Sequence, residues 1–267
     1  MRTVTFNIHA GVDGYGRVTG ALDELIDLRP DLVFVQELWR GDTLDQFVII
    51  RDKLNLQGDY ASLGEGERVT AQPGGRGWQH PLALLHGEEG LFFEGYRELK
   101  PRQAERRQKV QGLENGSWGV ALLTNRPILS LRIEPLTQLP RDKVRRALIV
   151  AKLRDEDREF YAVALHGAHL SHGSLRQYRE VAAHVTALSD ELPTVIGGDF
   201  NCWRPLLRTV LPGWRSGVRR KTWPAWRPHS QIDHLLLRGD WIVDNARSFN
   251  GTSDHRALVA DLHLNDA

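Results

Sequence analysis

Cysteine and methionine are almost missing from this 267-residue chain, which contains one of each, Cys202 and Met1. A single cysteine cannot form an intramolecular disulfide, so the small secreted folds that depend on disulfides are excluded. Net charge is also scarce, because 35 basic and 34 acidic side chains leave a formal charge of +1. Any attraction to a polyanion must therefore come from local groups of charge.

Long hydrophobic runs are missing as well. The sequence contains no apolar run of membrane-spanning length and no apolar export segment after Met1. As written, it predicts a cytoplasmic protein without a transmembrane segment, or a secreted one if a signal peptide has been trimmed. The length is compatible with one domain covering residues 1–267, and a monomer is the default expectation.

The chain does contain short apolar runs bounded by Gly, Pro, Asn or Asp, and such runs are typical of strands. Apolar residues at helical spacing predict helices at about 18–26, 44–54 and 174–192. Many strands with a few helices between them favour an α/β fold in which two sheets pack face to face with helices outside. The predicted strands are 3–8, 31–38, 118–125, 147–153, 159–170, 193–198, 231–237 and 255–264.

Residues 61–117 lack this pattern. They are rich in Gly, Arg and Glu and include the mixed-charge stretch "RELKPRQAERRQK". The segment predicts a long surface excursion from the domain, and excursions of this length are often functional.

Acid and amide side chains recur where the apolar runs end or begin. Asp199 and Asn201 in "GGDFN" lie two positions apart, so they would share one face of a strand. Any one such residue is most simply an ordinary solvated loop position. As a set, they offer the hard oxygen ligands that suit Mg²⁺ or Mn²⁺, whereas a zinc site needs closely spaced His or Cys. The set is Asn7, Glu37, Asp199, Asn201, Asp233 and Asp254, with His255 beside the last.

Six short motifs occur in a characteristic order from residue 3 to about 262: "FNIHAG", "DLVFVQEL", "GAHLS", "GGDFN", "QIDHLLL" and "SDHRALVADL". Each is weak alone, but together they are specific. The combination resembles the endonuclease/exonuclease/phosphatase superfamily of DNase I-like phosphoester hydrolases. The resemblance implies a four-layered α/β/β/α sandwich with one site at the edge of two packed sheets, where a Mg²⁺-class ion and a histidine act on a phosphoester.

The resemblance also implies roles for the oxygen ligands. Glu37 would hold the Mg²⁺ (or Mn²⁺) ion, Asn7 would help to place it, and Asp254 would lie beside it. Asp199 would orient or deprotonate the attacking water, and Asn201 would bond a phosphate oxygen.

The implied roles of the cationic and imidazole groups complete the site. His255 would bind the phosphate or act as acid/base, with Asp233 fixing its ring. His169 would contact the phosphate or help to protonate the leaving group. Arg146, or its neighbour Arg145, would correspond to the family's phosphate-contacting arginine. Both are named because adjacent residues point to opposite sides of a strand, so only one of them would face the site.

Three further residues favour structural roles. His166 is expected on the opposite face of its strand from His169, and His234 is expected to face away from Asp233. Cys202 favours a small packed side chain over a nucleophile.

The stretch "RSGVRRKTWPAWRP" interleaves basic and aromatic residues just before Asp233. Trp223 and Trp226 could stack on bases or sugars while neighbouring arginines contact phosphates. Alternatively, the tryptophans fill the core or rim of the sandwich. The sequence leaves these two readings open.

The leading hypothesis is a divalent-metal-dependent phosphodiesterase, with nucleic acid slightly preferred as the substrate. A phosphatase or a phospholipase C or sphingomyelinase-like enzyme acting on lipid or inositol phosphates is the alternative within enzymes. A catalytically silent relative that binds a phosphorylated partner is the alternative outside them. The fold alone does not choose among these.

Overall fold

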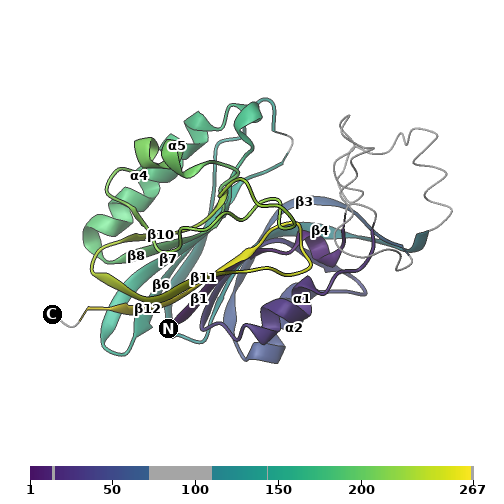
Figure 1. The fold of residues 1–267 in the computed structure, drawn as a ribbon, viewed down its shortest axis with the longest axis horizontal. Coiled ribbons are helices and arrows are strands. Elements are labelled where there is room, and N and C mark those ends of the chain that lie inside the picture. The colour runs from purple at the N-terminus through teal and green to yellow at the C-terminus, as the bar shows by residue number, and fades with distance from the viewer. Residues whose placement is uncertain (14–15, 72–109, 143, 266–267) are drawn as a thin grey trace.

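The computed structural model describes residues 1–13, 16–71, 110–142 and 144–265, and they form two six-stranded sheets (Figure 1). The first sheet has the order β11 (Trp241–Phe249), β12 (Ala257–Leu264), β1 (Arg2–Asn7), β2 (Leu32–Gly41), β4 (Val110–Thr124) and β3 (Gln57–Ala71). The second has the order β5 (Ile128–Pro135), β6 (Ala147–Asp155), β7 (Arg158–His166), β8 (Thr194–Asp199), β10 (Asp233–Arg238) and β9 (Arg215–Ser216).

The central strands are apolar on both faces because both faces are buried. On β2, Phe34 joins the core between the two sheets, whereas its neighbours Val33 and Val35 join the core beneath the first pair of helices. On β6, Ile149 faces the other sheet and Val150 faces outward. Strands buried on both sides read as continuous apolar runs.

Helices cover the outer face of each sheet, as Figure 1 shows. Helices α1 (Ala21–Asp27) and α2 (Gln46–Leu54) bury Leu25 and Ile50 against the first sheet. Helices α4 (Leu175–Glu191) and α5 (Arg204–Val210) bury Val185 and Leu207 against the second. Two single-turn 3-10 helices, η1 (His9–Gly11) and η3 (Leu170–His172), follow strand ends. The predicted four-layered α/β/β/α sandwich is confirmed.

The predicted excursion over residues 61–117 is wrong at both ends. Residues 61–71 belong to β3 and residues 110–117 to β4, and these two strands pair along their length as an antiparallel hairpin. The rest of that segment, 72–109, lies outside the described residues. Polar composition hid these stretches because β3 is an edge strand and residues 110–115 of β4 pair with β3 alone, beyond the end of β2, where the apolar pattern weakens.

Two other strands differ from the prediction. The strand β5 was not predicted, and most of its residues are only partly buried or exposed at the edge of the second sheet. The strand β7 ends at His166 rather than at residue 170, because the chain leaves the sheet there and turns into η3.

Strand polarity brings one end of many strands to a single edge of the sandwich. Strands β1 and β2 are parallel, as are β7 and β8, so the carboxyl ends within each pair lie together. Strands β10 and β12 run antiparallel to β8 and β1, so their amino ends reach the same edge. The polar residues that terminate these strands therefore converge, although they are spread over the whole sequence.

Two glycines interrupt β8 because the strand is packed too closely for side chains. A Cβ added at Gly197 would lie 1.9 Å from the Phe34 ring of the other sheet, and one added at Gly198 would lie 2.1 Å from the carbonyl oxygen of Leu165. The glycines therefore let β8 approach both its neighbour β7 and the opposite sheet.

Gly197→Ala should destabilise the protein by about 1–3 kcal/mol or more, because the added methyl forces Phe34 or β8 to move. Urea unfolding followed by fluorescence measures the change. Gly20→Ala is the matched control, since its Cβ would come no closer than 3.4 Å to another atom. Equal stability of the two variants would contradict the close-packing argument.

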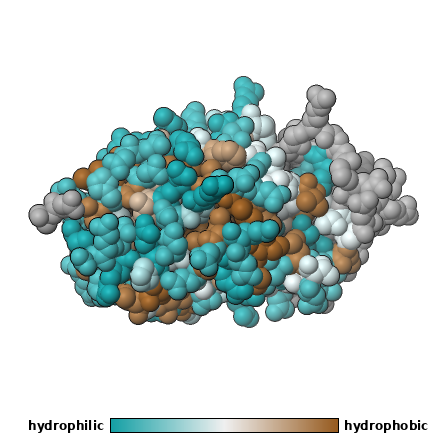
Figure 2. All heavy atoms as spheres, turned by 90° about the horizontal axis from the view of Figure 1, so that it is seen from below, coloured by the Kyte–Doolittle hydropathy of each residue, from teal (hydrophilic) through white to brown (hydrophobic). Residues whose placement is uncertain are grey.

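None of the described helices is long and apolar enough to cross a membrane. Figure 2 shows that hydrophilic residues cover most of the face seen there, with hydrophobic residues in separate patches between them.

Candidate active site

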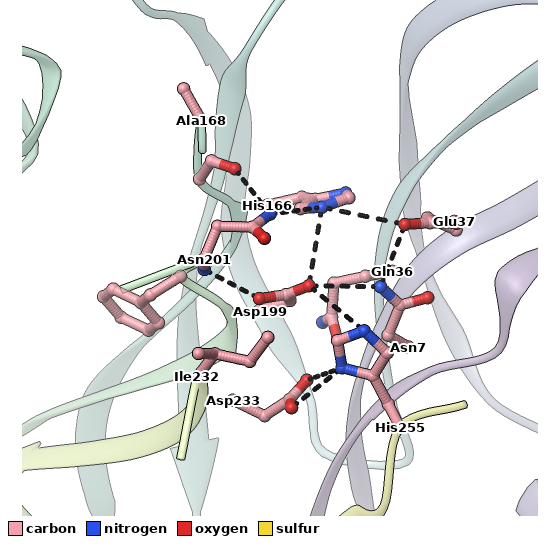
Figure 3. A network of polar contacts seen from close by, with 12 residues as sticks. Asn7, Gln36, Glu37, His166, Ala168, Asp199, Asn201, Ile232, Asp233 and His255 are labelled. Atoms are coloured by element: carbon pink, nitrogen blue, oxygen red, sulfur yellow. Dashed lines mark hydrogen bonds and ion pairs between the residues drawn. The ribbon is translucent and has the colours of Figure 1, made fainter. Parts of the chain in front are cut away.

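The strand ends place a network of polar side chains between the two sheets at one edge of the sandwich, drawn in Figure 3. Asn7 ends β1, His166 ends β7 and Asp199 ends β8, while Asp233 begins β10. His255 lies just before β12. All five are buried, and Asp233 and Asn7 are fully buried.

Asp199 is at the centre of the network. Its Oδ2 accepts a hydrogen bond from Asn7 Nδ2 at 3.2 Å, and its Oδ1 accepts one from the backbone N–H of Asn201 at 2.7 Å. Burial, and after it Asp233 and Glu37, raise the pKa of Asp199 to about 7, against the lowering effect of His255 and the Asn201 N–H. Its carboxylate is thus held among like charges with little solvent, which favours uptake of a proton or a cation.

His255 and Asp233 form a hydrogen-bonded pair. His255 Nδ1 lies 2.9 and 3.1 Å from the two carboxylate oxygens of Asp233, so Nδ1 donates and the ring orientation is fixed. His255 Nε2 then points toward Asp199 Oδ2, 3.8 Å away (Figure 3). Burial alone lowers the pKa of His255, but the carboxylates of Asp233, Asp254 and Asp199 together hold it well above its ordinary value.

Glu37 faces Asp199 from the other sheet. Its Oε1 accepts a hydrogen bond from Asn7 Nδ2 at 3.0 Å, so the Asn7 amide joins the two carboxylates. Glu37 has a left-handed φ of 52°, and the pairing of β2 with β4 shifts register there by a bulge. Bulges and left-handed non-glycine residues re-aim side chains at functional sites, and here the bulge turns Glu37 toward Asn7 and His166.

His166 also lies in the network, so the expectation that its ring faces away from the site is wrong. Its Nε2 lies 3.6 Å from Asp199 Oδ2, 3.9 Å from Glu37 Oε1 and 3.2 Å from Asn201 Nδ2. Burial lowers the pKa of His166 well below its usual value, and Arg146 and His255 lower it further, so the ring is neutral.

Strand alternation gave the wrong face for His166 because it assumed that β7 continues to residue 170. The strand ends at His166, which pairs in register with Asp199 of the parallel neighbour β8. The available signal was its place at the end of an apolar run, the same signal that singled out Asp199.

His169, by contrast, is not brought into the described network. It is exposed, its Nδ1 contacts Ser171 Oγ at 2.9 Å, and its ring lies beside that of His172. Asn201 does reach the network, with a left-handed φ of 48°. Its Nδ2 donates to the Gly167 carbonyl at 3.1 Å as well as contacting His166.

Of the two candidate arginines, Arg146 points inward and Arg145 is exposed. Arg146 pairs with Asp142 at 2.9 Å and donates through Nη1 to the His166 carbonyl at 3.3 Å. Its guanidinium therefore supports the chain at the end of β7.

The remaining predicted residues lie at or near the network. Asp254 Oδ2 is 4.0 Å from His255 Nε2, and its Oδ1 accepts from Ser253 Oγ. Trp223 is partly buried against His229, whereas Trp226 is exposed. The other residues expected to be structural behave so: His234 is buried with Nε2 on the Cys202 carbonyl, and Cys202 is buried.

A buried acidic and imidazole group could hold a metal ion. Ligand atoms of Asp199, Asp233 and His255 lie within 4.8 Å of one another. Asp233 is engaged by His255 Nδ1, whereas the carboxylates of Asp199 and, from the other sheet, Glu37 are joined only through the neutral Asn7 amide, so a cation could bind between them. Oxygen donors of this kind suit Mg²⁺ or Mn²⁺.

A sequence profile described as the Endonuclease/Exonuclease/phosphatase family matches residues 4–255, which includes every residue of the network. The chain belongs to this family. Its members are generally hydrolytic phosphoesterases. No curated protein matches the sequence.

Solved structures share the fold of this family member. An endonuclease/exonuclease/phosphatase protein from Beutenbergia cavernae is 19% identical with a TM-score of 0.63, over 100% of this chain and 72% of that one. The human Nocturnin catalytic domain with bound sulfate is 16% identical with a TM-score of 0.66, over 99% and 94%. Humanized D. rerio TDP2 is 16% identical with a TM-score of 0.56, over 98% of each chain. These likenesses show the fold alone.

Proposed function

We propose that this protein is a divalent-metal-dependent hydrolase of phosphodiester bonds. The observation that carries the proposal is the hydrogen-bonded Asp233–His255 pair, which faces Asp199 in one buried cluster. Between the two sheets, Asn7 links Asp199 to Glu37. An acid/base pair beside uncompensated carboxylates suits metal-assisted hydrolysis.

The ion, Mg²⁺ or Mn²⁺, would be held by Glu37 with Asn7 and Asp254 beside it. The fit rests on the buried carboxylates: burial, Asp233 and Glu37 all raise the pKa of Asp199, so a cation beside it would relieve an unfavourable charge density. When bound, the ion would withdraw charge from a phosphate oxygen and acidify water.

The chain's own groups then carry the proton transfers. Asp199 accepts a proton from the attacking water as the new P–O bond forms, and the bond to the leaving oxygen breaks. His255 donates Nε2–H to a phosphate oxygen that gains charge in the transition state, while Asp233 keeps its ring aligned. Asn201 orients His166 toward Asp199. The leaving alkoxide takes its proton from solvent.

In this proposal, residues around the buried cluster contact the parts of the substrate that lie beyond the scissile bond. Arg145, Trp223 and Trp226 lie outside the buried cluster and are exposed or partly buried. Arg146 acts as a positioning residue through the His166 carbonyl.

Hydrolysis of bis-p-nitrophenyl phosphate and of p-nitrophenyl phosphate, with Mg²⁺, Mn²⁺ or EDTA, tests this proposal. Wild type should cleave the diester only with metal, and Asp199→Ala should not cleave it. Asp52→Ala, an exposed acid on α2, is the matched control and should retain activity. A preference for the monoester would favour a phosphatase, and turnover in EDTA would contradict the metal requirement.

Mg²⁺ should raise the melting temperature of wild type but much less that of Glu37→Gln. A ligand that binds only the folded state at about 100 times its Kd stabilises it by about 2.7 kcal/mol. Differential scanning fluorimetry with and without Mg²⁺ measures the shift. Glu65→Gln removes an exposed acid from β3 and should keep the wild-type response. Equal shifts in both variants would place the ion elsewhere.

A further inference from the structure

The chain between Asp199 and Asp233 contains no acidic residue. We call residues 200–232 the acid-free segment. Basic and acidic side chains are nearly equal in number over the whole chain, so this segment is a strong local departure from balance. Apart from Arg215, which donates to the Trp241 carbonyl, its cations are Arg204, Arg208, Arg219, Arg220, Lys221 and Arg227.

These six cations have no acidic partner among the described residues, unlike many arginines elsewhere. Arg40, Arg126 and Arg158, for example, pair with carboxylates at 2.8, 2.7 and 2.6 Å. Five of the six side chains are exposed, and Arg204 is partly buried. Positive charge that no carboxylate of the described residues neutralises is available to an anion in solution.

Three of the cations gather beside an exposed tryptophan. Arg204 and Arg208 are four residues apart on α5, which places them on one side of the helix. Arg219 lies close enough to repel Arg204: after burial, Arg219 and then Arg208 lower the pKa of Arg204. Trp203, 57% exposed, precedes Arg204 and follows Asn201 of the network by two residues.

The other end of the acid-free segment is fixed to the opposite side of the network. The Ala225 N–H donates to the Asp254 carbonyl at 2.7 Å, and the Arg256 N–H donates to the Thr222 carbonyl at 2.9 Å. Trp226, 47% exposed, follows Ala225 directly. The segment thus presents an exposed tryptophan near Asn201 and another near Asp254, each with cations that lack an acidic partner among the described residues.

The geometry points to single-stranded nucleic acid as the substrate, bound along the acid-free segment on either side of the cleavage site. Arginines contact successive phosphates, and exposed tryptophans stack on bases that are not already stacked in a duplex. This inference rests on the proposed function, because it names the substrate of the same site.

Fluorescence anisotropy with a labelled oligothymidylate of about 12 nucleotides tests the inference. All variants are made in the Asp199→Asn background with Mg²⁺, so that binding is read without cleavage. One variant replaces Arg204, Arg208 and Arg219 by Gln, and a second is Trp203→Ala. The control replaces Lys53, Arg179 and Arg247 by Gln, which removes the same charge from exposed positions on α2, α4 and β11.

The triple variant in the segment should bind at least about tenfold more weakly, and its slope of log K against log salt should fall by about 2. Trp203→Ala should lose about 5- to 100-fold. The control should bind like the parent. These losses would support binding of single-stranded nucleic acid along the acid-free segment. If the diester assay showed no hydrolysis beside them, the proposed function would be contradicted and the bound strand would be a ligand rather than a substrate.

Three results would overturn the inference. Equal weakening in the control would mean that only net charge matters. Duplex DNA bound as tightly as the single strand would exclude base stacking. Absence of oligothymidylate binding, with phosphatidylserine vesicles bound through the same arginines, would assign the segment to a lipid surface instead.

Discussion

Replacing His255 with Ala, or Asp233 with Asn, should lower kcat for bis-p-nitrophenyl phosphate by about 10²- to 10⁴-fold. Asp233 holds His255 Nδ1 at 2.9 Å, so either change removes a correctly oriented Nε2–H from the site. Because the two groups act as a unit, the double variant should be no slower than the worse single variant. Steady-state kinetics in saturating Mg²⁺ measure all three.

The chain offers a matched control for this pair. His263 Nδ1 lies 2.8 Å from Asp244 Oδ2 in a His–Asp pair with the same contact, but on the exposed surface. His263→Ala and Asp244→Asn should leave kcat unchanged. Losses at His255 and Asp233 that multiply in the double variant would show that the two residues act independently.

His166→Ala should lower kcat for the same diester by about 100-fold, whereas His169→Ala should lower it by less than about threefold. His166 Nε2 is 3.6 Å from Asp199 and in contact with Asn201, so its loss disturbs the group that meets the attacking water. His169 is exposed and contacts Ser171, outside the described network. Kinetics of the two variants under identical conditions compare them.

Thermal unfolding of both variants separates a catalytic effect from a folding defect, since His166 is buried and His169 is exposed. A His166→Ala protein that melts near the wild-type temperature but turns over slowly would support a role in the reaction. A larger loss of activity at His169 would restore the role that the family resemblance implies for that residue.

The sequence predicted the buried layers better than the edges. Runs such as 147–153 and 193–198 became β6 and β8 nearly as expected, because strands buried on both faces must be apolar throughout. The edge strands β3, β5, β9 and β11 were missed. Their exposed faces carry polar residues, so they resemble loops until a neighbouring strand supplies hydrogen-bond partners.

The sequence by itself determined the types of residue at the site, since Asn7, Glu37, Asp199, Asp233 and His255 all follow from polar residues at the ends of apolar runs and from the family motifs. Only the tertiary structure decided which of them touch. Register between strands sets the distance from Asp233 to His255 and, through a bulge, the direction of Glu37. The end of β7 at His166 decides that His166, and not His169, lies beside Asp199. These are set by contacts between residues far apart in the chain, which local pattern does not record.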